Sequence, residues 1–207
     1  MKARYLFLFL FSIAMFFYNV AASAEGISVT PFIGYQYGGS ATADEGEVKF
    51  ADGENKGLSI EFRNTSLTMI QLLYITQDST VTLQNNVAGE ANGLFDLRTE
   101  YYHLGGIKEI VNGNAKTFVS GSFGATYFKP NDSRFSDETL FSISLGFGAD
   151  LAFTKRFSLI LQGRALLPFQ SGSGGLFCVG GVCKVHMQGS TSLIQYDLTA
   201  GLRFTFG

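Results

Sequence analysis

Hydrophobic and polar residues alternate one by one along residues 141–153, which read FSISLGFGADLAF. Every odd position in this segment is apolar, whereas the even positions hold Ser, Gly, Asp or Ala. Residues 194–206 show the same alternation, with the apolar side chains at the even positions. A repeat of two residues is typical of a β-strand, and a helix does not produce it. The chain is therefore expected to form strands with one apolar and one polar face.

Six further segments carry similar runs, which brings the expected number of strands to eight. They are residues 27–37, 57–64, 67–76, 94–107, 116–128 and 156–168. For the segment 67–76, the alternation does not decide which face turns inward, because Met69 to Tyr74 is apolar on both sides. The segment lengths are close to the roughly 9–11 residues that a tilted strand needs to cross a membrane.

The connections between these segments alternate in length. The long ones are residues 38–56, 77–93, 129–138 and 169–191, and the short ones lie near residues 65, 111–115 and 154–155. An even number of strands with long and short loops on opposite rims is the plan of an outer-membrane barrel. We therefore predict an all-β fold, an eight-stranded antiparallel up-and-down transmembrane β-barrel with four long extracellular loops.

The composition of the polar face predicts which face turns inward. Alternation places five acids and four arginines on it, and no lysine: Glu61, Arg63, Asp96, Arg98, Glu100, Asp150, Arg164, Asp197 and Arg203. Buried charges persist when they are paired, and the guanidinium fork of arginine fits a carboxylate. We expect these residues to form a charge network inside the barrel, with the apolar face toward lipid. Eight strands enclose a space that side chains can fill, so a wide pore is not expected.

The dipeptide Gly180-Gly181 predicts how the last strands pair. As a two-residue hairpin turn, it would place Arg164 opposite Asp197 and Gln162 opposite Thr199. The same register places Cys178 opposite Cys183. Because exported proteins meet an oxidising compartment, we predict a disulfide between the two cysteines.

The N-terminal residues have the layout of a secretory signal peptide. Lys2 and Arg4 precede an apolar run over residues 5–17, and Ala22-Ser23-Ala24 provides a small-residue cleavage pattern. An uncleaved anchor would need about 20 apolar residues, and Asn19 interrupts this run before that length. We predict a cleaved signal peptide over residues 1–24 and a barrel over residues 25–207.

Composition and charge exclude several classes of protein. Only 15% of the residues are charged, against about 25% in soluble domains, and 46% are hydrophobic. The net charge of −2 leaves no basic surface for nucleic acid. The predicted long loops hold ten acids and five bases, so an acidic outer rim is expected. Binding of a calcium ion or of a cationic partner at this rim is an open alternative, although no EF-hand spacing is present.

No catalytic motif or cofactor signature stands out, and we predict neither an enzyme nor a cofactor or metal site. His103 is expected on the lipid face beside Tyr101 and Gly105, which offer no nucleophile, and His186 lies in the cysteine loop. No GxSxG, HExxH or P-loop sequence occurs.

Aromatic residues gather where the membrane boundaries are expected. The outer set is Tyr35, Tyr37, Tyr127, Phe128 and Phe169, and the inner set is Phe153, Phe157, Phe204 and Phe206.

The opening segment ISVTPFIGYQY and the closing segment LIQYDLTAGLRFTF resemble those of small eight-stranded outer-membrane barrels, the OmpA/OmpX-like superfamily. The resemblance implies contact with outer-membrane lipid and lipopolysaccharide. It also implies insertion by the barrel-assembly machinery, with Phe204 and Phe206 resembling the C-terminal assembly signal and Gly207 following them.

The leading functional hypothesis is a non-enzymatic integral barrel of a Gram-negative outer membrane. Its acidic loops would serve surface interaction, adhesion or envelope integrity, with an extracellular ligand that the sequence does not name. Two alternatives stay open: a lipid-A-modifying enzyme on the same scaffold, and a narrow channel for small or apolar solutes.

Overall fold

The computed structural model describes residues 26–43, 46–85, 91–112, 115–132, 135–169, 175–179, 182–186 and 193–206. No helix among these residues is long and apolar enough to cross a membrane. The strands are β1 (Ile27–Tyr37), β2 (Ser40–Ala43), β3 (Gly46–Phe50), β4 (Gly53–Arg63), β5 (Thr68–Asn85), β6 (Ala91–Asn112), β7 (Ala115–Pro130), β8 (Glu138–Ala152), β9 (Phe157–Phe169), β10 (Gly175–Val179), β11 (Val182–His186) and β12 (Gln195–Phe206).

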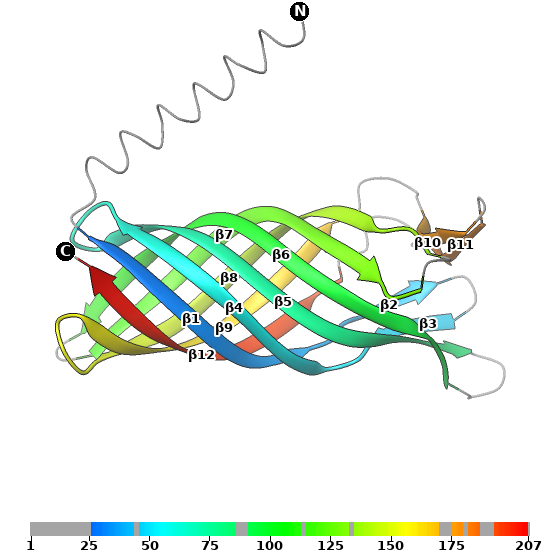
Figure 1. Ribbon diagram of the computed structural model, residues 1–207, viewed down its shortest axis with the longest axis horizontal. Helices are drawn as coiled ribbons and strands as arrows, with labels where there is room; N and C mark the ends of the chain where they lie inside the picture. Colours follow the sequence, from blue (N-terminus) through cyan, green and yellow to red (C-terminus); the bar gives the residue numbers. More distant parts are fainter. Residues whose placement is uncertain are drawn as a thin grey trace, which may run out of the picture.

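Eight of these strands close into an antiparallel barrel (Figure 1). Around the wall they follow the order β5, β4, β1, β12, β9, β8, β7 and β6, and the pairing of β5 with β6 closes the ring. Each of the eight predicted segments lies largely within one of these strands. The predicted eight-stranded fold is confirmed.

Both described ends of the chain lie at one end of the barrel (Figure 1). The short connections 64–67 and 153–156 lie at that end, and the hairpins β2–β3 and β10–β11 lie at the other. Because outer-membrane barrels have short periplasmic turns and longer extracellular loops, we call these the inner and the outer end.

The prediction that residues 77–93 form a long loop is wrong. Strand β5 continues to Asn85, β6 begins at Ala91, and the two remain paired apart from a bulge between Val81 and Thr82. Strand β3 joins the other edge of β5 there, with Phe50 opposite Val81. Thr80, Val81 and Thr82 are residues that favour strands, and the polarity of the segment reflects its place beyond the apolar band of the wall.

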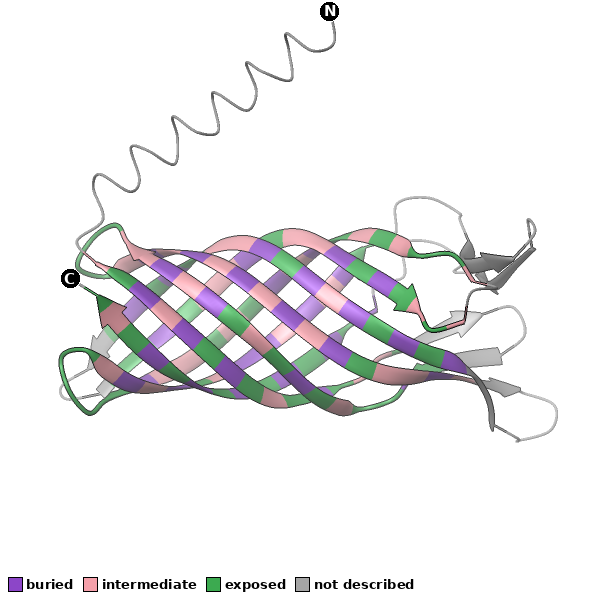
Figure 2. Cartoon of the chain, in the orientation of Figure 1, coloured by how far each residue is buried: buried purple, intermediate pink, exposed green. Residues whose placement is uncertain are grey.

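The two faces of the wall differ sharply, as the alternation of exposed and buried residues in Figure 2 shows. Outward side chains are apolar and open, as for Ile33 and Phe147, each 71% exposed. Inward side chains include fully covered polar groups such as Gln36 and Asp197. Apolar side chains outside and polar ones inside are the arrangement of a barrel that spans a membrane.

The predicted register of the last strands is confirmed. Asp197 is the partner of Arg164, and Thr199 is the partner of Gln162. In the outer hairpin, Cys178 and Cys183 are backbone partners across β10 and β11. The side chains of these cysteines lie outside the described residues, so the disulfide stays a prediction. The same holds for the signal peptide, since residues 1–24 are also outside them.

Candidate functional site: the closed barrel interior

An ion triad fills the inner half of the barrel. Arg203 of β12 donates through Nε to Glu61 Oε2 of β4 at 3.2 Å and through Nη1 to Asp150 Oδ2 of β8 at 2.6 Å. The hydroxyl of Thr30 donates to both oxygens of Glu61, at 3.2 and 3.1 Å. All four residues are buried. The triad thus joins three strands that are not neighbours, since β1 lies between β4 and β12 and β9 lies between β12 and β8.

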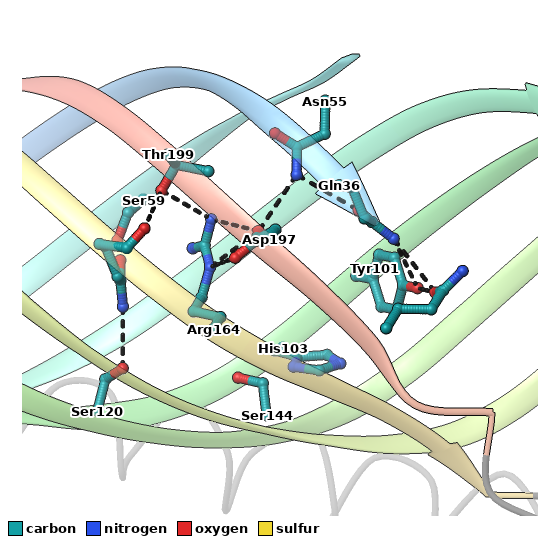
Figure 3. Close-up of polar contacts among 12 residues, drawn as sticks. Gln36, Asn55, Ser59, Tyr101, His103, Ser120, Ser144, Arg164, Asp197 and Thr199 are labelled. Atoms are coloured by element: carbon teal, nitrogen blue, oxygen red, sulfur yellow. Dashed lines mark hydrogen bonds and ion pairs between the residues drawn. The ribbon is translucent and has the colours of Figure 1, made fainter. Parts of the chain in front are cut away.

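A second ion pair lies near the middle of the barrel (Figure 3). Arg164 Nη2 donates to Asp197 Oδ2 at 2.8 Å and Nε donates to Oδ1 at 3.0 Å, and both side chains are almost completely covered. Asn55 donates to the same Asp197 Oδ2 at 3.2 Å. The guanidinium of Arg164 also lies 4.6 Å from the ring centre of Phe32. Pairing and hydrogen bonding together compensate for removing these charges from water.

Hydrogen bonds continue from this pair toward the outer end (Figure 3). Asn55 Nδ2 donates to Gln36 Oε1 at 3.3 Å, and Gln36 Nε2 donates to Gln195 Oε1 at 3.2 Å. The Tyr101 hydroxyl donates to the same oxygen of Gln195. Strands β1, β4, β6 and β12 therefore share one buried hydrogen-bond network.

His103 lies inside the barrel, and its expected place on the lipid face is wrong. Its Nδ1 is 3.0 Å from Ser122 Oγ, and its Nε2 is 2.7 Å from Ser142 Oγ. Ser122 Oγ lies in turn 2.7 Å from Ser144 Oγ. A Cβ at Gly124 would overlap the Tyr102 carbonyl oxygen and lie 2.8 Å from His103 Cδ2, so glycine allows the close approach of β6 and leaves room for the imidazole. The ring is held by hydroxyl groups on both sides.

Three members of the predicted interior charge network, Asp96, Arg98 and Glu100, lie on the outside of the wall. Arg98 Nε donates to Asp78 Oδ1 at 2.7 Å, and both side chains are mostly exposed. Lys129 Nζ lies 2.6 Å from Glu100 Oε2. This part of β6 reaches past the membrane band, so its outward face meets water and carries the charges. The rule that polar residues turn inward fails there.

The Asp78–Arg98 pair also changes the acidity of the carboxyl group. The hydrogen bond that Arg98 donates stabilises the carboxylate, and it holds the pKa of Asp78 below its ordinary value. This pair lies at the outer end, in contact with solvent.

The remaining predicted network member, Arg63, faces the interior at the inner mouth. It pairs with Glu109 at 3.2 Å, and the Glu109 side chain is covered. Sequence reasoning missed Glu109 because it took the wrong face of β6 as the inner one. Among the nine predicted charges, six thus face the interior: Glu61, Arg63, Asp150, Arg164, Asp197 and Arg203.

Apolar clusters complete the filling of the interior. Phe32, Leu73, Ile75, Tyr101 and Leu166 form one cluster, and Met69, Ile107, Phe118 and Ile160 form the other. A cavity of about 10 Å³ beside Glu61, Gln71 and Arg203 offers room for about one water molecule. No group of three metal-ligating side chains occurs among the described residues. The described interior is a packed core rather than an open channel.

Aromatic belts mark both ends of the apolar wall. The outward tyrosines gather at the outer end, with ring centres 4.9 Å apart for Tyr74 and Tyr102 and 5.6 Å apart for Tyr102 and Tyr127. Outward phenylalanines mark the inner end, where Phe157 lies 5.2 Å from Phe204. Phe128, expected in the outer belt, is buried inside instead. Phe204 and Phe206 are exposed at the end of β12, and their role in assembly stays a prediction.

Comparison with solved structures gives the same architecture. Neisserial surface protein A is 16% identical, with a TM-score of 0.58 over 87% of this chain and 97% of its own. The outer membrane protein OprG from Pseudomonas aeruginosa is 12% identical, with a TM-score of 0.57 over 88% and 97% of the two chains. The fold is that of a small outer-membrane barrel.

A third structure of this outer-membrane barrel class is the outer membrane protein AlkL in DMPC lipid bilayers. It is 11% identical and has a TM-score of 0.57 over 88% of this chain and 91% of its own. No protein-family model matches the sequence, and a search of curated proteins also finds no match. At these identities, the likeness establishes the barrel fold and leaves the function to the residues themselves.

Proposed function

We propose that the protein is a non-enzymatic integral protein of a Gram-negative outer membrane that acts through its outer end. The observation that carries this proposal is the interior as far as its residues are described, where ion pairs, hydrogen bonds and apolar clusters surround a cavity of about 10 Å³. A barrel of this kind works as a scaffold, because nothing larger than a water molecule fits in that space.

The outer end supports a role in surface interaction, adhesion or envelope integrity. Strands β2, β3, β5 and β6 continue the sheet beyond the tyrosine belt and bring charged groups such as Asp78, Arg98 and Asp96 to the surface. The predicted outer connections hold more acids than bases, which favours a basic or cation-bridged extracellular ligand. The lipopolysaccharide of the outer leaflet would surround the belt.

Export and insertion complete the proposal. Residues 1–24 would direct the chain through the inner membrane and be removed, leaving residues 25–207. The outward Phe204 and Phe206 at the end of β12 would be read by the barrel-assembly machinery.

The contacts of His103 argue against the lipid-A-modifying alternative. His103 does contact serine hydroxyls, but its two ring nitrogens meet Ser122 and Ser142 inside the barrel, away from the lipid-facing surface. A hydrolase of the Ser–His type orients its imidazole with a carboxylate, and the described contacts of His103 include none. Against the channel alternative stand the apolar clusters and the ion pairs that cross the described part of the interior.

Protease treatment of intact cells tests the proposed topology and the exposed regions. We expect cleavage confined to the outer connections, residues 38–52, 86–90, 131–137 and 170–194, with residues 64–67 and 153–156 protected until the membrane is opened. Cleavage of the inner turns in intact cells would refute the orientation. Deleting residues 86–90 and comparing cell adhesion and detergent sensitivity would then test whether the outer end carries the function.

A further inference from the structure

A groove runs along the outside of the barrel wall across β1, β12, β9 and β8. It forms a hollow of about 740 Å³ whose outward lining is Ile33, Ala200, Leu161, Ala149, Phe147 and Leu198. Ile33, Ala200, Leu161 and Ala149 follow one another as register partners, so they form one row across four strands. Because strands in a barrel are tilted, such a row descends along the wall rather than circling it at one height.

Small residues make this row hollow. Ala149 and Ala200 form its floor, whereas Phe147 and Leu198 are 71% and 57% exposed and stand beside it. Gly163 lies between these two larger side chains, where an added Cβ would be 3.3 Å from Leu198 and 3.5 Å from Phe147. The hollow is apolar and open to the outside of the wall, which suits a hydrocarbon chain.

A polar hollow of about 540 Å³ joins the groove at its outer end. The two hollows share Ile33 and Tyr35, and the polar one adds Glu54, Lys56 and Thr76. Lys56 is the register partner of Ile33, so its backbone position continues the row that forms the groove. The combined surface is polar at the tyrosine belt and apolar below it, which is the profile of an amphiphile.

The charges of the polar hollow define the head group that fits. Asp78 lines the same hollow and is engaged by Arg98, and the nearby Lys56 also helps to lower the Asp78 pKa, whereas neither Glu54 nor Lys56 makes an ion pair with another described residue. A cation and an anion thus stand two residues apart on the outward face of β4. A phosphate would accept from Lys56 while a nearby amine donates to Glu54, whereas a purely anionic head group would be repelled by Glu54.

We propose that this composite groove binds one zwitterionic phospholipid, with its phosphate at Lys56, its amine at Glu54 and one acyl chain along the row from Ile33 to Ala149. The site rests on the proposed residence in the outer membrane, and it would hold a glycerophospholipid among the lipopolysaccharide of the outer leaflet.

Native mass spectrometry of the refolded protein in detergent, titrated with phosphatidylethanolamine, tests the head-group site. We expect one retained lipid, and Lys56→Gln should weaken its retention about tenfold, the low end of what a hydrogen bond to a charged group contributes. Lys108→Gln is the matched control, because Lys108 is an exposed lysine on β6 near the inner end. Equal retention of phosphatidylglycerol and phosphatidylethanolamine, or an unchanged affinity in Lys56→Gln, would overturn the assignment.

Filling the groove tests the acyl-chain site. Gly163→Leu and Ala200→Leu place a larger side chain in the hollow and should abolish selective retention. Gly106→Leu adds the same side chain to the outside of β6, where a Cβ meets only a backbone oxygen at 3.6 Å, and should retain the lipid. A gel shift on boiling verifies that each variant is folded, and equal retention in all three variants would refute the groove. Loss of lipid binding leaves surface cleavage unchanged, so the two proposals fail separately.

Discussion

The arginine–carboxylate contacts inside this barrel are buried ion pairs. Arg164 and Asp197 are almost fully covered, and each is also hydrogen-bonded to further groups, including Thr199 and Asn55. In such a setting, the cost of removing one partner exceeds the benefit of the pair, because the other charge stays buried without compensation.

Asp197→Ala should therefore lower the free energy of unfolding by about 3–5 kcal/mol. Urea titration of the protein in lipid vesicles, followed by the gel shift on boiling, measures the change. Asp78→Ala is the matched control, since Asp78 also pairs with an arginine but is exposed to water, and it should leave the midpoint nearly unchanged. Similar effects of the two variants would contradict the importance of burial.

His103 provides a test that separates structure from catalysis. His103→Ala removes two buried hydrogen bonds, while Ser122 keeps Ser144 and Ser142 keeps Thr126 as a partner, and it should lower the free energy of unfolding by about 1–3 kcal/mol. Lipid A from cells that express this variant should have the same mass spectrum as lipid A from wild-type cells. A change in acylation that depends on His103 would revive the enzymatic alternative.

The Asp78–Arg98 pair predicts a pH effect at the outer end. Because the pKa of Asp78 is lowered, the pair contributes stability above the ordinary aspartate pKa, and this contribution is lost as pH falls through the lowered value. In Arg98→Ala, the Asp78 pKa should rise toward its ordinary range. Carboxyl carbon shifts followed by NMR during an acid titration measure it, and an unchanged pKa would show that Arg98 is not its cause.

At the scale of the elements, the sequence predicted the strands correctly, but it predicted the inward-turned face correctly only for some of them. The alternation in β8 and β12 was unambiguous, and the Gly180-Gly181 turn then gave the correct partner of Arg164. Strand β6 was assigned the wrong face, because its outer part carries charges toward water and its inner face carries Tyr101 and Leu97. Polarity indicates the inner face only within the membrane band, and the charged outer part of β6 was interpreted as if it lay inside that band.

Contacts across the barrel could not be predicted from the sequence either. Glu61, Asp150 and Arg203 were each expected inside, but their meeting depends on the stagger of strands that are not neighbours. The apolar clusters were missed for a related reason, since Leu73 and Ile75 belong to β5, whose segment is apolar on both faces over residues 69–74.

The outer hairpin β10–β11 carries a prediction at the same scale. Cys178 and Cys183 are opposite one another in the backbone register, a position from which a disulfide can form. Protein purified from the outer membrane without reductant should gain no mass with iodoacetamide, and two alkyl groups should be added after reduction. Alkylation of both cysteines before reduction would refute the bond.

The whole molecule combines a lipid-facing apolar wall with an interior closed by its own side chains. Two consequences should therefore occur together in the refolded protein. It should migrate differently on gels before and after boiling, because the closed hydrogen-bonded wall resists detergent at room temperature. It should also give no steady conductance steps in a planar bilayer, because Arg164, Phe32 and Tyr101 fill the middle of the barrel. Steady steps from a heat-modifiable protein would show that the interior rearranges in lipid, whereas identical migration before and after boiling would show that the barrel had not formed.

The double variant Phe32→Ala with Tyr101→Ala makes the test sharper, since conductance that arises only on removing these rings would place the seal at the middle of the barrel.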